Sequence, residues 1–332
     1  MVIPRNSTST PGAIVLPMES EAEGFHFQLD ADPEFSICRR VAYIVPTATS
    51  YQVRGAIEIN VRGGCDAAPQ AGNGEYILTG IKLSNDPLRP KLFVSGWDDY
   101  APRGDVELSD DFAQAWRTGD TVYAHEPNFG KIDVISLSQG KLLRTVRPPA
   151  NVRQWFPKFA RDGDFWGVAN YGQLGKGELW RTDALGNSNA VLQKSGTHIF
   201  APNTDGTTMF WIEASGSEVD LLDQPKVEVW AGPYSKDGAV TRAGARRLLD
   251  VSGICRAQRS TARRDFYAVS LGETELLVIR GRDGAFQRVK LLGGWGYPTP
   301  AYVDEKFVWF SYGSEKPVEN SVARMELDPW PP

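Results

Sequence analysis

Five side chains with the chemistry of a ligand-binding site occur at related positions in short, strand-like segments. Trp155 and Tyr297 offer aromatic faces that can stack on a sugar or another flat molecule. His198 can donate or accept a hydrogen bond, while Lys158 and Arg256 can pair with an anionic group. We therefore predict that these five residues bind a glycan, a small molecule or a protein, provided that the fold brings their segments together.

The spacing of four of these residues supports the grouping. Trp155, His198, Arg256 and Tyr297 each stand seven residues before the end of a segment, and those ends are marked by Asp162, Asp205, Arg263 and Asp304. Segments that run side by side in one direction would place the four residues at one level. Further arginines approach that level, which favours an anionic ligand; they are Arg39, Arg40, Arg153 and Arg259. The alternative interpretation is that the aromatic residues are packing wedges and the arginines ordinary surface residues.

Motifs of well-known catalytic and cofactor sites do not occur in the chain. The three histidines, His26, His125 and His198, are far apart in sequence, and no His-x-His or Cys-x-x-Cys spacing is present, so we expect no metal. A Gly-x-Ser-x-Gly elbow is absent too, and the glycine-rich stretches match neither a phosphate loop nor a dinucleotide fingerprint. We therefore expect no cofactor, and whether the protein is an enzyme stays open.

Glu213 is an acid within the aromatic segment MFWIEASG. It could be a buried general acid, or it could occupy the outward-facing position of an alternating strand. The second interpretation is favoured, because strands of this kind usually expose every other side chain.

Composition and charge narrow the classes of partner. The 332 residues carry a formal net charge of -5 without any long basic run, so nucleic acid is not expected as a partner. The apolar runs fall far short of the roughly 20 residues that span a membrane. The polar start, residues 1–12, resembles no signal peptide and is expected to be disordered. We expect a monomer located in the periplasm or outside the cell.

A repeated pattern must position the candidate residues. Strand-like segments rich in aromatic residues end at Pro127, Gly172, Gly216, Gly272 and Gly313, in steps of 45, 44, 56 and 41 residues. A unit of about 40 to 45 residues is the length of one four-stranded propeller blade. The aromatic residues that recur in these segments are expected to form the core; they are Tyr123, Trp166, Trp211, Tyr267 and Trp309.

Aspartate and glycine mark the strand ends of the repeat. Asp162-Gly163 and Asp205-Gly206 follow one strand of the unit, and Asp183, Asp237 and Asp283 precede Gly186, Gly238 and Gly284 in a later turn. Over roughly residues 112–328 this pattern resembles the TolB-like or WD40-like β-propeller superfamily. The resemblance implies a fold and no activity.

We therefore predict an all-β propeller of six four-stranded antiparallel blades in one domain, residues 13–332, after the leader. Four segments near the start, CRRVAYIVP, YQVRGAIEINVRG, GEYILTGIKLSND and KLFVSGW, are counted as one blade. Seven blades result if this region is divided differently. An N-terminal strand, either AIVLPM or FHFQLD, is expected to close the ring by completing the last blade after SVARMEL.

The three cysteines cannot all pair within one chain. Cys38 and Cys65 flank two segments that could form an antiparallel pair, which would bring their far ends together. Whether these two residues form a disulfide stays open, and Cys255 would then be buried and free.

Two classes of function fit these observations. The first is a non-catalytic propeller that recognises a glycan, a small molecule or a protein at one face of the ring. It is favoured because no catalytic constellation emerges from the sequence. The alternative is an enzyme that uses the axial pocket, either a polysaccharide lyase, a glycoside hydrolase or a small-molecule cyclase.

Overall fold

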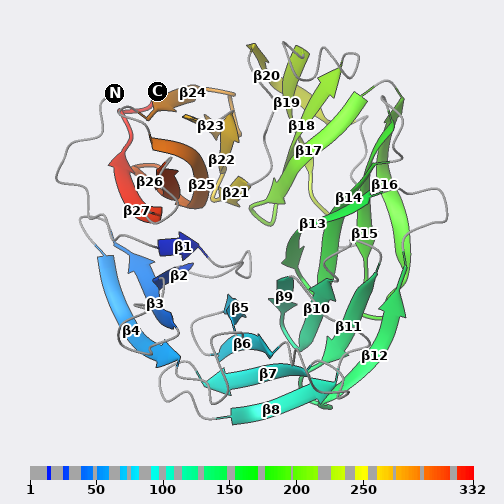
Figure 1. The fold of residues 1–332 in the computed structure, drawn as a ribbon. Coiled ribbons are helices and arrows are strands. Elements are labelled where there is room, and N and C mark those ends of the chain that lie inside the picture. Colours follow the sequence, from blue (N-terminus) through cyan, green and yellow to red (C-terminus); the bar gives the residue numbers. More distant parts are fainter. Residues whose placement is uncertain are drawn as a thin grey trace.

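The structure is a computed structural model, and its strands surround a central axis as a ring (Figure 1). It describes residues 13–15, 25–29, 39–47, 51–59, 68–72, 76–81, 91–96, 102–107, 114–125, 131–147, 154–170, 176–195, 197–215, 226–235, 244–252, 260–271, 274–291, 295–314 and 320–332. Cys38, Cys65, Cys255 and the leader lie outside these ranges, so the predictions for them stay predictions.

The first two blades are four-stranded antiparallel sheets in which consecutive strands are neighbours. Their strands are β1 (Ala13–Val15), β2 (Phe25–Leu29), β3 (Arg39–Pro46), β4 (Tyr51–Ile59), then β5 (Ala68–Gly72), β6 (Tyr76–Ile81), β7 (Lys91–Gly96) and β8 (Pro102–Glu107). The four segments counted as one blade in the sequence are β3, β4, β6 and β7, and the pairing divides them between two sheets. This division gives seven blades in the described part of the chain, the alternative count of the prediction.

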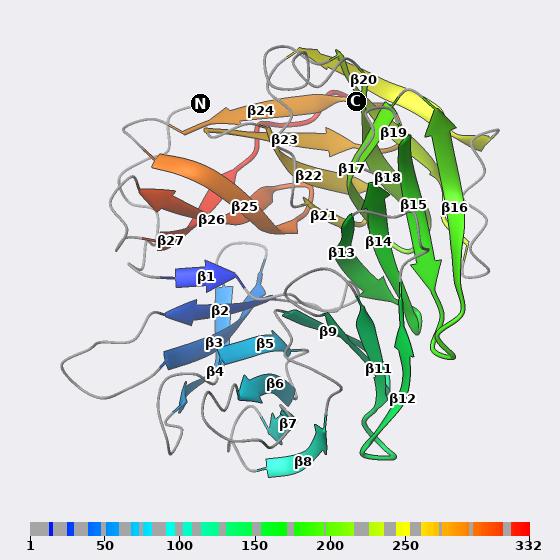
Figure 2. The same cartoon turned by 45° about the vertical axis from the view of Figure 1, so that its right-hand side comes forward.

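The next three blades repeat the same order. Their strands are β9 (Gln114–Thr118), β10 (Thr121–His125), β11 (Ile132–Ser136), β12 (Lys141–Val146), then β13 (Gln154–Arg161), β14 (Asp164–Asn170), β15 (Lys176–Thr182), β16 (Ser188–Ser195), then β17 (Thr197–Thr204), β18 (Thr208–Ser215), β19 (Lys226–Pro233) and β20 (Arg246–Ser252). Figure 2 shows β13 nearest the centre and β16 on the outside. A single parallel bridge, Lys176 to Thr197, joins the fourth blade to the fifth.

The last two blades comprise a four-stranded and a three-stranded sheet. Their strands are β21 (Ser260–Arg263), β22 (Phe266–Leu271), β23 (Glu275–Arg280), β24 (Phe286–Lys290), then β25 (Trp295–Val303), β26 (Phe307–Ser314) and β27 (Asn320–Glu326). Both segments that were expected to complete the last blade belong to the first: Ala13 pairs with Leu29 within it, and β1 lies alongside β26 and β27 without extending their sheet. The prediction that an N-terminal strand completes the last blade is therefore corrected. Each N-terminal strand forms its hydrogen bonds with the neighbouring strand of the first blade.

Aspartate side chains hold the turns between strands. Asp162 and Gly163 form a two-residue hairpin with φ values of 54° and 88°, the left-handed conformation that such a turn requires. In the three-residue turns, one carboxylate oxygen of Asp205 accepts hydrogen bonds from the backbone of Thr207 and Thr208, at 2.9 and 2.8 Å. Asp183 and Asp283 accept backbone hydrogen bonds in the later turns in the same way. These aspartates of the repeat are therefore turn formers, because their short side chains replace a missing backbone partner. Asp237 lies outside the described residues.

The hydrophobic core lies in the spaces between blades. Every residue of β10, β11 and β22 is buried, whereas the outer strands β12 and β24 are largely exposed. A middle strand is covered on both faces because a blade packs against each side of it. The five aromatic residues predicted as core are all at most 3 % exposed, which confirms that prediction.

Candidate functional site

The innermost strand of each blade runs in the same direction along the axis. The inner strands β5, β9, β13, β17, β21 and β25 are the first strands of their blades, and each lies next to the following one. Their turns meet at one end of the ring: Gly163 N donates to Thr118 Oγ1 of the preceding blade at 2.9 Å, and Asp265 N donates to Asp205 Oδ2 at 2.7 Å. The opposite end, formed by the first residues of β13, β17 and β25, is called the mouth below.

Three of the predicted ligand-binding residues belong to the mouth. Trp155 and His198 are the second residues of β13 and β17, and Tyr297 is the third residue of β25. In the hairpin register, Trp155 stands opposite Ala169 and His198 opposite Ala214. The fold therefore places residues that are far apart in sequence at one end of the ring. Arg256 lies outside the described residues.

Lys158 and His198 are both half-buried. Lys158 occupies the bulge of β13, where the register shifts between Pro157 and Phe159. A bulge re-aims the side chain of the extra residue, so Lys158 departs from the alternation of its strand. The imidazole of His198 stacks on Phe200, with ring centroids 6.0 Å apart and planes inclined by 30°.

The seam between the fourth and fifth blades fixes the backbone beside His198. At Gly177 of β15, a Cβ atom would lie 2.6 Å from Ile199 N and 2.9 Å from the backbone oxygen of Thr197. No side chain fits at that distance, so only glycine allows β15 to approach the start of β17 this closely. This contact could not be predicted, since Gly177 stands in GKGELW, which has the pattern of an ordinary turn.

Glu213 is buried, at 1 % exposure, so the predicted outward-facing position is wrong. Its carboxylate accepts a hydrogen bond from Trp211 Nε1 at 3.1 Å. Its cross-strand partner is Glu228, which accepts a hydrogen bond from Trp230 Nε1 at 3.3 Å. Sequence reasoning missed this second acid. The two carboxylates are neighbours on one face of the blade, because residues opposite each other in an antiparallel pair have Cβ atoms about 5 Å apart.

Within the described ranges, no group of three or more histidine, cysteine, aspartate or glutamate side chains could hold a metal ion. In the same ranges, no helix has the length and apolar character needed to cross a membrane.

The ring of antiparallel blades defines the class: the chain is a β-propeller. Comparisons with known protein families and with curated proteins give no match. Among solved structures the chain is similar to hydrazine synthase of Kuenenia stuttgartiensis, with a TM-score of 0.56, 12 % identity, and coverage of 96 % of this chain and 97 % of that one. It is also similar to Hsv2 of Kluyveromyces lactis, with a TM-score of 0.56, 11 % identity, and coverage of 96 % and 98 %.

A third similar structure is the β-propeller domain of the Trilobed protease from Pyrococcus furiosus, which is described as having an open velcro topology. Its TM-score is 0.55 at 10 % identity, with coverage of 96 % of this chain and 99 % of that one. Likeness at such low identity concerns the fold alone, and the function has to be argued from the site.

Proposed function

We propose that the protein is a ligand-binding propeller whose binding site is the mouth. The observation that carries this proposal is the shared position of Trp155, His198 and Tyr297, at the start of three inner strands that begin at the same end of the ring. Packing between blades is achieved by the aromatic residues of the second strands, such as Trp166 and Tyr267.

The ligand class follows from the chemistry of the five residues. Two aromatic faces favour a ring, a histidine favours hydrogen-bonding groups on it, and the charges of Lys158 and Arg256 favour an acidic substituent. A glycan that contains uronic acid combines all three properties, as does a flat anionic small molecule. We therefore place acidic glycans first among the ligands to be tested.

A double variant, Trp155→Ala with Tyr297→Ala, tests the site. The wild-type chain is first screened on a glycan array that includes uronic-acid polymers, and the affinity for the best ligand is measured by titration calorimetry. We expect the double variant to lose at least tenfold in affinity while its melting temperature stays close to that of the wild type. Phe286→Ala is the matched control, because Phe286 is 45 % exposed and lies at the other end of the ring.

Two results would contradict the assignment of the mouth as the binding site. If the double variant unfolds while the fraction that remains folded binds the ligand as the wild type does, the two aromatic residues are wedges and the mouth is not the site. Loss of affinity in the Phe286→Ala control would also move the site away from the mouth.

Turnover is examined with the same preparation. A polysaccharide lyase would release unsaturated products from the bound polymer, which absorb in the ultraviolet. The pair of Glu213 and Glu228 does not favour a glycoside hydrolase, because a general acid has to contact the glycosidic oxygen and Glu213 is covered by protein.

A further inference from the structure

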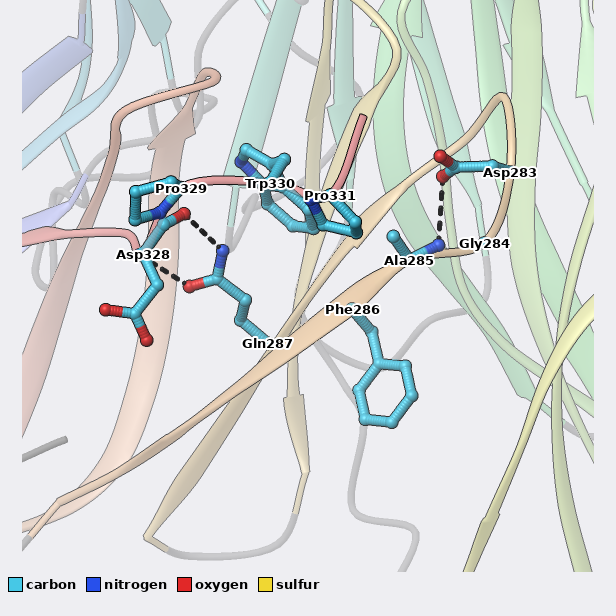
Figure 3. A pocket seen from close by; sticks show the side chains of 9 residues that line it. All are labelled: Asp283, Gly284, Ala285, Phe286, Gln287, Asp328, Pro329, Trp330 and Pro331. Carbon is cyan, nitrogen blue, oxygen red and sulfur yellow. Dashed lines mark hydrogen bonds between the residues drawn. The ribbon is translucent and has the colours of Figure 1, made fainter.

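The segment Asp328–Pro331 lies at the end of the ring opposite to the mouth and forms one wall of a groove. One wall is the turn between β23 and β24 with the start of β24, and the other is the segment itself (Figure 3). The space between the walls has a volume of about 530 Å³. Asp328, Pro329 and Pro331 are exposed, and only Trp330 is half-buried. The segment therefore lies on the surface of the ring as an applied peptide would.

Two side chains of the sixth blade, those of Gln287 and Arg280, form hydrogen bonds with the backbone of this segment. The amide of Gln287 donates to the backbone oxygen of Asp328 and accepts a hydrogen bond from Asp328 N, each at 2.8 Å (Figure 3). The guanidinium of Arg280 donates to the backbone oxygen of Pro331 at 2.7 Å. These contacts resemble the hydrogen bonds that a neighbouring strand offers, so they hold an extended backbone whatever its side chains are.

Trp330 supplies the specific contact. Its indole Nε1 donates to the backbone oxygen of Glu305 in the last blade at 2.8 Å. Its ring lies 5.3 Å from that of Phe266, and the guanidinium carbon of Arg280 lies 5.5 Å from its centroid. Because Phe266 and Arg280 belong to the sixth blade, the indole is inserted across the boundary between two blades. Tryptophan is the side chain that combines this buried area with one hydrogen-bond donor.

The prolines on either side keep the segment extended. Pro329 and Pro331 restrict the backbone before binding, so less conformational entropy is lost when the segment docks. The segment belongs to no sheet, so it can leave the surface without breaking a strand pairing of a blade. Space also remains beside it, next to the exposed ring of Phe286.

We propose that the surface beneath this segment, formed by Phe266, Arg280, Gln287 and Glu305, is a peptide-binding site for an extended segment with tryptophan between two prolines. In this structure the chain's own residues 328–331 occupy it, and a second protein with the same chemistry competes for it. This site is independent of the mouth and of any ligand bound there.

A labelled peptide with the sequence of residues 326–332, capped at both ends, is the probe. Its binding is measured by fluorescence anisotropy to the full chain and to the full chain with Trp330→Ala, whose own segment lacks the anchor. We expect the variant to bind the peptide at least tenfold more tightly than the wild type. Adding Gln287→Ala to that variant is expected to weaken binding about tenfold, because two hydrogen bonds are lost.

Two controls separate recognition from unspecific adhesion. In the first control, Gln139→Ala is combined with Trp330→Ala in place of Gln287→Ala. Peptide binding should then stay unchanged, because Gln139 is an exposed residue of the third blade. A peptide with alanine in place of the tryptophan should not bind. A folded Trp330→Ala chain without saturable binding would overturn the proposal, as would equal binding with and without Gln287. If the wild type formed dimers and the peptide dissociated them, two copies of this chain would be exchanging the segment. That result would contradict the proposal of a second protein as partner.

Hydrogen exchange provides a second test should Trp330→Ala fail to fold. In the wild type, an excess of the unlabelled peptide is expected to speed exchange at the amide of Asp328, which Gln287 protects. Exchange that stays unchanged at saturating peptide would mean that the segment is a fixed part of the ring and that the surface beneath it receives no partner.

Discussion

The hydroxyl of Tyr123 donates a hydrogen bond to the backbone oxygen of Gly163 in the next blade, at 2.6 Å. The ring of Tyr123 stacks on Phe165 of that blade, with centroids 5.0 Å apart. Burial raises the pKa of this hydroxyl above its usual range, so it stays a donor at any physiological pH. The hydroxyl of Tyr267 donates to the backbone oxygen of Ala201 at 2.7 Å and so links its blade to the preceding one. One tyrosine thus serves both as core residue and as link between blades.

Tyr123→Phe should lower the free energy of unfolding by about 1 to 3 kcal/mol, because it leaves a carbonyl group between blades without its donor. Urea unfolding followed by circular dichroism gives the difference. Tyr234→Phe is the matched control: its hydroxyl bonds to the exposed carboxylate of Asp162 at 3.0 Å, which water can replace. A larger loss for Tyr234→Phe than for Tyr123→Phe would contradict this account.

Arg264 has a φ of 46° in the two-residue turn after β21, a conformation that costs a residue with a side chain about 1 to 2 kcal/mol. Arg264→Gly removes that strain, and the greater freedom of glycine in the unfolded chain costs about 0.5 to 1 kcal/mol. A net gain in stability of roughly 0.5 kcal/mol is therefore expected.

The converse change is Gly163→Ala at a φ of 88°, where no atom lies within 4 Å of the added carbon. It should destabilise through the backbone alone, and thermal unfolding of both variants measures the two effects.

Gly177→Ala should destabilise the seam between the fourth and fifth blades by about 1 to 3 kcal/mol, because the new methyl group meets backbone atoms of β17. It should also weaken ligand binding at the mouth, since Thr197 and Ile199 flank His198. Gly140→Ala serves as the control, where nothing lies within 4 Å and only the positive φ opposes the change. Equal ligand affinities of the Gly177→Ala and Gly140→Ala variants would mean that the seam has no influence on binding at the mouth.

Asp283 makes the low-pH stability of the sixth blade depend on one carboxylate. Hydrogen bonds from Arg280 and from the backbone of Ala285 lower its pKa to about 2. Since this value lies below that of the unfolded chain, the charged carboxylate stabilises the folded state above about pH 4, and the contribution is lost as the pH falls towards 2. The difference in unfolding free energy between wild type and Asp283→Asn should shrink over that range, as measured by urea titrations at several pH values. A difference that widens at low pH would contradict the assignment.

The sequence predicts best what depends on neighbouring residues. Asp162-Gly163 and Asp205-Gly206 mark real turns because the turn conformation is satisfied within a few residues. Trp166 and Tyr267 recur in the second strands of their blades because the space between neighbouring blades has to be filled. The candidate site followed from the same periodicity, which identifies the strand starts that carry Trp155, His198 and Tyr297.

Features that depend on distant partners could not be predicted. The division of the first region into two blades rests on the pairing of β2 with β3 and of β5 with β6, and this region lacks the Asp-Gly marks of the later repeats. The burial of Glu213 was missed because alternation assumes one solvent-facing side, whereas a middle strand of a blade has none. The close approach at Gly177 is a backbone contact that no side-chain pattern records.

Each sheet of the described ring is formed by strands that follow one another along the chain, and only the bridge from Lys176 to Thr197 crosses a blade boundary. One contiguous stretch of the gene therefore encodes one blade. Duplication or loss of such a stretch would add or remove a complete unit without splitting a sheet, so a ring of this kind can change its circumference in a single recombination event.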